Sequence, residues 1–509
     1  MDHPRPALAA LPSRVERRPA VTPNYLSLLH ALLPEASLVL GALVVLGFDL
    51  IVGRRHDLAQ RTVYATVLGL LAVAAAVYHS YDARLDGEVF GGVFILDSLA
   101  LATRVGVLLL TALTLALLPG VTRVKQPAEY VAIVLLATTG FTLMAIAQQL
   151  LVAFLALELA SLSLYILAGF DRSRPESAEA ALKYFLLGGI SAAFLLFGFS
   201  LLYGLTGSIA LPEIARQLSV QAMSPLLLAA VLMTVVAFGF KAAAAPFHLW
   251  APDVYQGAPP TSAALIASGS KLAGLVMFTR LLWSGVGPSA GSVATFDVVP
   301  GWVPAVALAA VASLLIGNLG AIAQTNVRRL LAYSAIAHAG VLLLGVIVAG
   351  KFGPAALVYY AGTYGLATVG AFGVVAVLDA AGVGGSFADL AGLRQRSPLL
   401  AFCLVVFLLS LAGIPPLAGF FGKFAVFTAA LKLNGLASWA GWLSIFAIAM
   451  SAVGLYYYLL VLKNAVVIPG RPDAAPIKVP VAAATALLLA TALLLLLGLF
   501  PSVVLRAVS

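Results

Sequence analysis

Long apolar segments recur from one end of the chain to the other, and this feature constrains the fold more than any other. Each segment is about 20 residues long, the length that an α-helix needs to span a bilayer. In lipid, only helices and closed barrels can satisfy their own backbone hydrogen bonds. Barrel strands alternate polar and apolar residues, and these segments do not. The sequence therefore predicts an all-α polytopic membrane protein.

The composition agrees with this prediction. Apolar residues make up 62% of the 509 residues and charged residues only 10%, whereas a soluble domain carries about 25% charged residues. The formal net charge of +9 comes mostly from short loops between apolar segments, which is a signal of membrane topology. We therefore expect a lipid bilayer as the surroundings and no nucleic acid as a partner.

Polar breaks divide the chain into about fourteen predicted transmembrane helices. They cover residues 27–52, 62–79, 92–118, 127–146, 149–170, 178–206, 223–250, 259–285, 302–322, 329–350, 354–380, 398–428, 435–463 and 479–505. The first 25 residues are basic and rich in proline, and no short apolar stretch with a cleavage site follows them. We interpret residues 1–25 as a disordered tail.

The loops differ in charge from one side of the predicted membrane to the other. Every second loop, starting after the first helix, collects fourteen basic residues: Arg54, Arg55, Arg61, Arg123, Lys125, Arg172, Arg174, Arg328, Arg329, Arg394, Arg396, Lys463, Arg471 and Lys478. The opposite loops hold four: Arg84, Arg216, Lys351 and Lys432. Because basic loops stay in the cytoplasm, both termini are predicted outside, although the basic tail runs against this bias.

The chain has no constellation for redox, nucleotide or metal chemistry. Its single cysteine, Cys403, lies in an apolar run and cannot by itself hold an iron–sulfur cluster. Neither a GxGxxG fingerprint nor a Walker loop occurs. We therefore predict no metal site and no cofactor-binding site, and we expect any redox chemistry to belong to partner subunits.

Two of the predicted helices contain proline in their interior. Pro246 interrupts one, and Pro415 and Pro416 interrupt the other. Proline removes a backbone hydrogen bond and clashes with the preceding turn, and membrane helices tolerate such breaks where they line a cavity. Each break has a lysine nearby, Lys241 in "FGFK" and Lys423 in "FFGK". Broken helices at corresponding places in two halves indicate the internal repeats of transporters.

Seven ionisable residues are candidates for proton translocation within the membrane. They are Glu158, Lys183, Lys241, His248, Lys271, His338 and Lys423. An isolated charge at the bilayer centre costs from about 3 to more than 10 kcal/mol, so a chain that keeps several has a use for them. An incompletely compensated buried ammonium group releases its proton more readily than one in water.

Each candidate also has a structural interpretation. Lys241 could be paired permanently with one carboxylate, Glu158 for example, and the same holds for Lys271 and Lys423. Lys183 could extend its ammonium group to the membrane surface. His248 could belong to an interfacial aromatic belt and His338 to the core. A further set, Glu35, Asp49, Asp97 and Glu129, lies near predicted helix ends, and we interpret these acids as structural.

Four stretches carry a resemblance to a known family. They are "GFKAAAAPFHLWAPDVYQGAPPTSAALIASGSK", "FLALELASLSLYILAGF", "GNLGAIAQTNVRRLLAYSAIAHAGVLLLG" and "AGIPPLAGFFGKF". Over roughly residues 30 to 465, with these motifs in the family's order along the sequence, the chain closely resembles the antiporter-like membrane subunits of bacterial respiratory complex I, subunit N in particular. Sister subunits and Mrp-type antiporters tend to have a glutamate where this chain has Gln256.

The resemblance implies a fold and an organisation. It implies fourteen helices with two inverted five-helix repeats built around broken helices 7 and 12. The corresponding segments are the tail (1–25), helices 1–3 (26–126), the first repeat with helices 4–8 (127–285), the second repeat with helices 9–13 (302–464), and a loop with helix 14 (465–509).

The resemblance also implies a function. Protons would be translocated in the bacterial cytoplasmic (inner) membrane, driven by NADH:quinone oxidation in partner subunits that hold FMN and iron–sulfur clusters and bind NADH and quinone. Partners would be sister antiporter-like subunits and small membrane subunits. By motif position Glu158 modulates the central Lys241, Lys271 connects the halves, Lys423 leads to the exit side, and Lys183 is the sixth-helix lysine. The alternatives are a subunit of an Mrp-like cation/proton antiporter and a scaffold subunit that does not pump.

Overall fold

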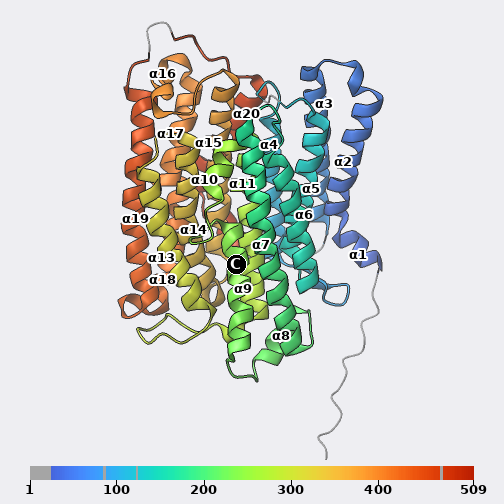
Figure 1. Ribbon diagram of the computed structural model, residues 1–509, viewed down its shortest axis with the longest axis vertical. Coiled ribbons are helices and arrows are strands. Elements are labelled where there is room, and N and C mark those ends of the chain that lie inside the picture. Colours follow the sequence, from blue (N-terminus) through green and yellow to red (C-terminus); the bar gives the residue numbers. More distant parts are fainter. Residues whose placement is uncertain (1–24, 84–86, 122–123, 471–473, 509) are drawn as a thin grey trace, which may run out of the picture.

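Helices that run roughly in one direction make up most of the chain (Figure 1). The computed structural model describes residues 25–83, 87–121, 124–470 and 474–508. The predicted tail lies outside these residues except for Tyr25, as do Arg84, Arg123 and Arg471 of the topology argument. Within the described chain, thirteen helices are long and apolar enough to cross a membrane. The shorter apolar helix α17 (Pro398–Ala412) and α18 (Ala418–Asn434) make the remaining crossing between them, so the prediction of about fourteen spans is confirmed.

The N-terminal part contains four helices and a small hairpin. These are α1 (Tyr25–Ala31), α2 (Leu33–Ile51), α3 (Leu58–Asp82), β1 (Gly87–Val89), β2 (Phe94–Leu96) and α4 (Ser98–Ala116). The strands pair antiparallel, with Gly87 opposite Leu96. The helix predicted from residue 92 is therefore wrong over its first six residues. The Asp97 carboxylate accepts a hydrogen bond from Ala100 N at 2.7 Å, and this cap fixes the start of α4 at Ser98.

The middle part contains the first broken helix. Its elements are α5 (Pro127–Ile146), α6 (Leu150–Ala168), α7 (Pro175–Thr206), α8 (Leu211–Leu218), α9 (Pro225–Ala242), α10 (Ala251–Gly257), α11 (Pro260–Ala267), α12 (Gly269–Arg280) and a π-helical turn, η2 (Leu281–Gly285). The single helix predicted over 223–250 ends at Ala242, and a short loop then leads into α10. Proline at 246 and the left-handed backbone of Ala243, with φ of +56°, end it there.

The C-terminal part contains the second broken helix. Its elements are α13 (Trp302–Ile322), α14 (Val327–Phe352), α15 (Ala355–Ala380), α16 (Leu393–Arg396), α17, α18, α19 (Trp439–Leu462), α20 (Val481–Leu499) and α21 (Ser502–Val508). The helix predicted over 398–428 stops at Ala412 and resumes at Ala418, because Pro415 and Pro416 cannot continue the ladder of hydrogen bonds.

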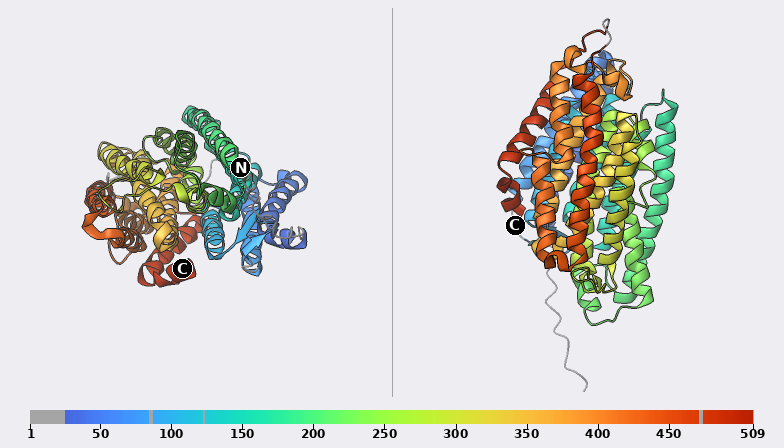
Figure 2. Two further views of the ribbon diagram at one scale, coloured as in Figure 1. Left: turned by 90° about the horizontal axis from the view of Figure 1, so that it is seen from below. Right: turned by 90° about the vertical axis from the view of Figure 1, so that its left-hand side faces the viewer.

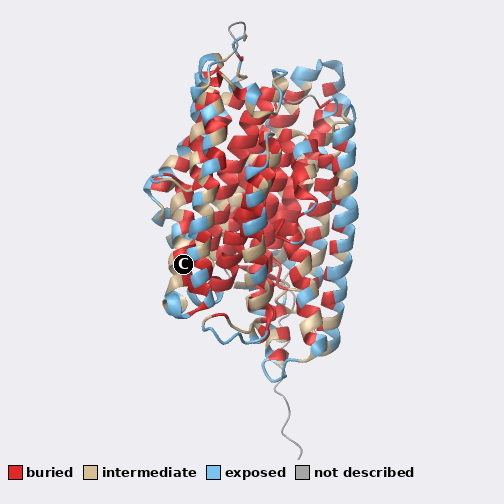
Figure 3. Ribbon diagram, turned by 60° about the vertical axis from the view of Figure 1, so that its left-hand side comes forward, coloured by how far each residue is buried: buried red, intermediate tan, exposed pale blue. Residues whose placement is uncertain are grey.

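The centre of the bundle is formed by α11, α12, α14 and α15, which are almost wholly buried. Figure 3 shows buried residues concentrated along this axis and exposed residues on the outer helices. In the end-on view of Figure 2, the N-terminal helices lie at one end of an elongated cross-section and the C-terminal half at the other. The apolar outer faces of helices such as α2 and α7 suit a bilayer, whereas the central helices α12 and α14 hold two of the ionisable candidates, Lys271 and His338.

Candidate functional site

Lys241 lies on α9, two residues before the first break. Its side chain is buried, with 6% exposed, and its Nζ donates to the Ser161 hydroxyl on α6 at 3.1 Å. Gly274 of α12 lies against its stem, because a Cβ there would stand 2.9 Å from Lys241 Cγ. The close approach of α12 thus holds the lysine toward α6.

Glu158 is near Lys241 but not paired with it. The two side chains line one cavity of about 10 Å³, which is about the volume that one water needs. No ion pair between them is present in the described chain, and the Oε1 of Glu158 has no hydrogen-bond partner there. The carboxylate is therefore close enough to act on the ammonium group electrostatically without neutralising it at contact distance.

Lys271 lies at the centre of the molecule on α12. It is 2% exposed, and its Nζ donates to the backbone carbonyl of Ala335 on α14 at 2.8 Å. The same ammonium group lies 5.2 Å from the ring centroid of Tyr364 on α15, which is within cation–π distance. Both partners are uncharged.

His338 of α14 is held by two tyrosines. Its Nδ1 is 2.5 Å from the Tyr360 hydroxyl and its Nε2 is 3.1 Å from the Tyr458 hydroxyl, and Tyr458 is also hydrogen-bonded to Ser334. The imidazole is 4.9 Å from the ring of Tyr364, which lies 5.2 Å from Lys271 Nζ, and it lines one cavity together with Lys423. The ring therefore lies between these two lysines.

Lys423 lies on α18, after the second break. Its Nζ donates to the carbonyls of Leu411 at 3.1 Å and Ala412 at 3.0 Å, which the end of α17 leaves without helical partners. It shares a cavity of about 20 Å³ with His338 and Asn318. The negative end of the α17 dipole favours a cation at this place.

The predicted residues thus separate into two groups. Lys241, Lys271, His338 and Lys423 form a buried series from α9 to α18, with Glu158 at its beginning. Lys183 is not part of it: its side chain is 41% exposed and pairs with Glu179 and Asp253 at 2.6 Å each. This exposure agrees with the interpretation in which Lys183 extends its ammonium group to the membrane surface, where α10 places Asp253 beside it.

Asp253 of α10 connects its own helix with α7 and α14 through ion pairs. Besides Lys183 of α7, Arg329 of α14 donates to its carboxylate at 2.8 Å. Partial burial favours the neutral acid, but the hydrogen bonds from the two cations outweigh it, so the pKa of Asp253 lies below its usual range. His248 lies in the loop before α10, 8% exposed, and its Nδ1 has no partner in the described chain.

Two buried arginines, which no sequence pattern had selected, each pair with an acid from another part of the chain. Arg104 of α4 donates to both oxygens of Glu35 at 2.9 Å. Arg280 of α12 binds Asp97, with contacts of 2.9 Å and 2.5 Å. Glu35 lies in the first turn of α2, in agreement with the prediction of a structural acid near a helix end, and it is only 5% exposed. Within the described chain, no group of three or more His, Cys, Asp or Glu residues could hold a metal ion.

Comparison with known proteins identifies the protein family to which the chain belongs. The profile of the NADH:quinone oxidoreductase/Mrp antiporter transmembrane family matches residues 147–451, which contain all seven ionisable candidates. The chain belongs to this family.

Individual relatives narrow the assignment to subunit N. The chain is 48% identical to NADH-quinone oxidoreductase subunit N 2 of Acidobacterium capsulatum, over 95% of this chain and 99% of the relative. It is 37% identical to subunit N 1 of Roseiflexus castenholzii, over 94% and 97%. Among solved structures, a chain of respiratory complex I from Thermus thermophilus with bound aureothin has a TM-score of 0.76 at 34% identity, covering 94% of this chain and all of that one. A chain of the Mrp complex from Dietzia sp. DQ12-45-1b has a TM-score of 0.79 at 22% identity, which shows the shared fold alone.

Proposed function

We propose that this chain is the proton-translocating subunit N of a bacterial NADH:quinone oxidoreductase. Its relatives carry this subunit's name. Redox chemistry would take place in partner subunits, which hold FMN and iron–sulfur clusters and bind NADH and quinone. Sister antiporter-like subunits and small membrane subunits would adjoin this chain in the cytoplasmic membrane, with both termini outside. Residues 127–285 and 302–464 would be the two inverted repeats.

One observation carries the proposal at the level of residues. Three lysines that are 2–8% exposed, Lys241, Lys271 and Lys423, are held by a hydroxyl, by carbonyls and by an aromatic ring. None of the ion pairs in the described chain includes them. Uncharged partners stabilise an ammonium group less than a carboxylate at contact distance does. Each lysine can therefore bind and release a proton at a modest cost in free energy.

A sequence of transfers follows from this arrangement. Movement of the Glu158 carboxylate toward Lys241 favours the protonated lysine, and movement away favours release. One pKa unit corresponds to about 1.4 kcal/mol, so small displacements suffice to bias the direction of transfer. Lys271 would receive the proton next, and the His338 imidazole, between Lys271 and Lys423, would pass it on. Lys423 would release it.

The test is to replace Lys241 or Lys271 by methionine in the assembled complex and to measure proton translocation per electron. Loss of translocation with the complex intact supports the proposal, and unchanged stoichiometry in both variants would sink it. The Mrp-like alternative requires no redox partner. Migration of the chain on a native gel with a large NADH dehydrogenase assembly separates the two, because an antiporter subunit would migrate without reductase activity.

A further inference from the structure

One face of α15 connects Lys271 with the charged end of the bundle. Tyr364, Thr368, Phe372, Ala376 and Asp379 are spaced four, four, four and three residues apart, so they form one stripe along the helix. The stripe begins at the ammonium group of Lys271, which lies 5.2 Å from the Tyr364 ring. It ends at Asp379, which pairs with Arg174 at 3.0 Å and Arg328 at 2.9 Å.

Three buried hydroxyl groups along this stripe make no hydrogen bond of standard geometry in the described chain: Tyr364 Oη, Thr368 Oγ1 and Tyr255 Oη. The hydroxyls of Tyr364 and Thr368 are close enough to interact with each other. Tyr364 and Thr368 are each 3% exposed and Tyr255 is 1% exposed. Tyr255 belongs to α10, and its ring centroid is 5.8 Å from that of Phe372. The three hydroxyls are therefore distributed along the same side of α15.

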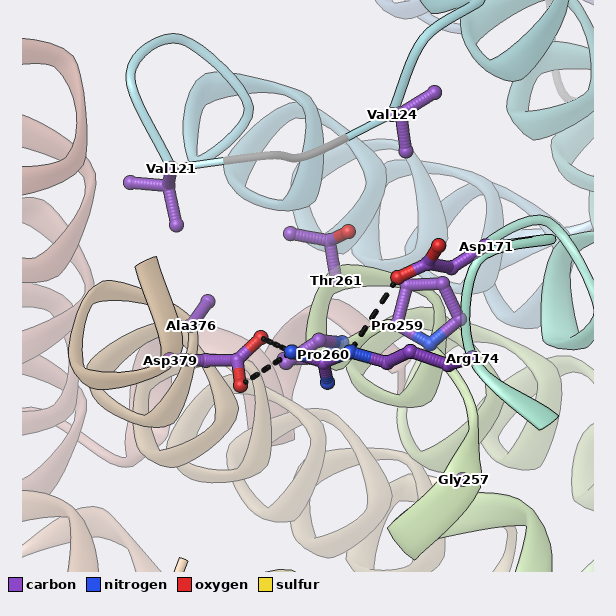
Figure 4. A pocket seen from close by; sticks show the side chains of 10 residues that line it. All are labelled: Val121, Val124, Asp171, Arg174, Gly257, Pro259, Pro260, Thr261, Ala376 and Asp379. Atoms are coloured by element: carbon purple, nitrogen blue, oxygen red, sulfur yellow. Dashed lines mark hydrogen bonds and ion pairs between the residues drawn. The ribbon is translucent and has the colours of Figure 1, made fainter. Parts of the chain in front are cut away.

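The other end of the stripe borders two cavities. Ala376 and Asp379 line a cavity of about 30 Å³ together with Arg174 and Thr261, and Figure 4 shows the Asp379 carboxylate facing the Arg174 guanidinium. Asp379 also borders a larger cavity of about 310 Å³. Gln256, the residue after Tyr255, lines that larger cavity.

A buried hydroxyl without a partner is unfavourable, and ordered water is the usual partner where protein groups are absent. A larger polar cavity at the charged end can supply such water. Each hydroxyl can accept a hydrogen bond from one water and donate to the next, so a proton can pass without a net change in the hydroxyl itself. The apolar Phe372 and Ala376 lie between the polar positions and keep the route narrow.

We propose that Tyr255, Thr368 and Tyr364 form a water-mediated proton route from the charged cavities to Lys271. The route runs along α15 from the charged end of the bundle to its centre, and it reaches Lys271 without passing Lys241. The inference rests on the proposed function, in which Lys271 carries protons, and deepens it by naming a separate supply for that lysine. The three residues are positioning residues, since they hold water and do not themselves store the proton.

The first test does not depend on pumping. Hydroxyl radicals made from water by X-ray exposure of the solubilised complex oxidise tyrosines that have water beside them. Tyr359 is a matched control: it lies on the same helix, is 1% exposed, and its hydroxyl donates to the Leu497 carbonyl at 2.8 Å. We expect Tyr255 and Tyr364 to be oxidised several-fold faster than Tyr359. Equal rates for the three tyrosines would overturn the proposal.

The second test addresses the supply of protons. Tyr255→Phe and Thr368→Val should each lower the rate of proton translocation several-fold at unchanged assembly, whereas Tyr359→Phe should leave it unchanged. Wild-type translocation in both route variants would overturn the supply role even if water is present. Lys271→Met tests the proposed function separately: if it abolishes translocation while the route variants do not affect it, the function holds and the route fails.

Discussion

The two broken helices end in the same way but use their lysines differently. At the first break, Ala243 N bonds to Phe240 O and Ala244 N to Gly239 O. At the second, Gly413 N bonds to Ser410 O and Ile414 N to Leu409 O. Both are helix ends closed by a left-handed residue, with the paired backbone bonds that accompany one.

The difference lies in which side chains bond to the carbonyls at the end of each helix. At the first break, the indole Nε1 of Trp250 donates to Phe240 O at 3.0 Å, in addition to Ala243 N, and Lys241 bonds to a hydroxyl on another helix. At the second, Lys423 itself bonds to two freed carbonyls. In the proposed mechanism, the side chain that caps the first break is therefore not the lysine that carries the proton, whereas at the second break one lysine has both roles.

The largest expected effect belongs to Lys241. In Lys241→Met the proton carrier is removed while the helix end keeps its cap, so translocation should fall to background at nearly unchanged stability. Positioned proton-transfer groups typically contribute about 10²–10⁴-fold to a rate. The measurement is proton uptake into vesicles per NADH oxidised. Lys432→Met, an exposed lysine on α18, is the control, and equal behaviour of the two variants would contradict the assignment.

Lys423→Met should abolish translocation and also destabilise the protein. Two carbonyls at the end of α17 lose their donor, and each buried unsatisfied group costs about 1–3 kcal/mol. We therefore expect the thermal midpoint of the solubilised complex, followed through this chain, to fall further for Lys423→Met than for Lys241→Met. Equal midpoints would remove the distinction between the two breaks.

The sequence predicted this comparison only in part. The apolar runs, the interior prolines and the cost of a buried charge were enough to select Lys241, Lys271 and Lys423. The sequence also shows that Lys241 precedes its proline and that Lys423 follows its own. It does not show what each ammonium group contacts, because side-chain direction depends on how each helix resumes. Pairs such as Arg280 with Asp97, 183 residues apart, and Lys183 with Asp253, 70 residues apart, depend on tertiary packing that no local pattern encodes.

Trp250→Phe tests the cap of the first break. The phenyl ring retains the stacking on Tyr184, whose centroid is 4.4 Å away, but cannot donate to Phe240 O. We expect a loss of about 1 kcal/mol, with translocation reduced less than in Lys241→Met. The exposed Trp442 also donates to a carbonyl, of Leu436, and water can replace that bond, so Trp442→Phe should change the thermal midpoint less. The reverse order would contradict the role given to Trp250.

Gly413→Ala tests the turn of the second break. The backbone has φ of +88°, where an L-residue costs roughly 1–2 kcal/mol, and the new methyl would stand 3.1 Å from Lys423 Cδ. We expect both a lower thermal midpoint and slower translocation, because the new methyl group strains the backbone and also displaces Lys423. Gly207→Ala, at φ of +66° with open space around it, carries the backbone strain alone. It should lower the midpoint without slowing translocation.

Ala243→Gly should have the smallest effect, because three terms nearly cancel. Relief of the left-handed strain at φ of +56° gains roughly 1–2 kcal/mol. The greater freedom of glycine in the unfolded chain opposes this by about 0.4–1 kcal/mol, and loss of a fully buried methyl group by about 0.8 kcal/mol. The thermal midpoint should therefore stay close to that of the unmodified complex, in contrast to its fall in Gly413→Ala. A clear fall of the thermal midpoint in Ala243→Gly would mean that the packing of the Ala243 methyl group stabilises the first break by more than the strain relief gains. The two turns would then share only their backbone conformation.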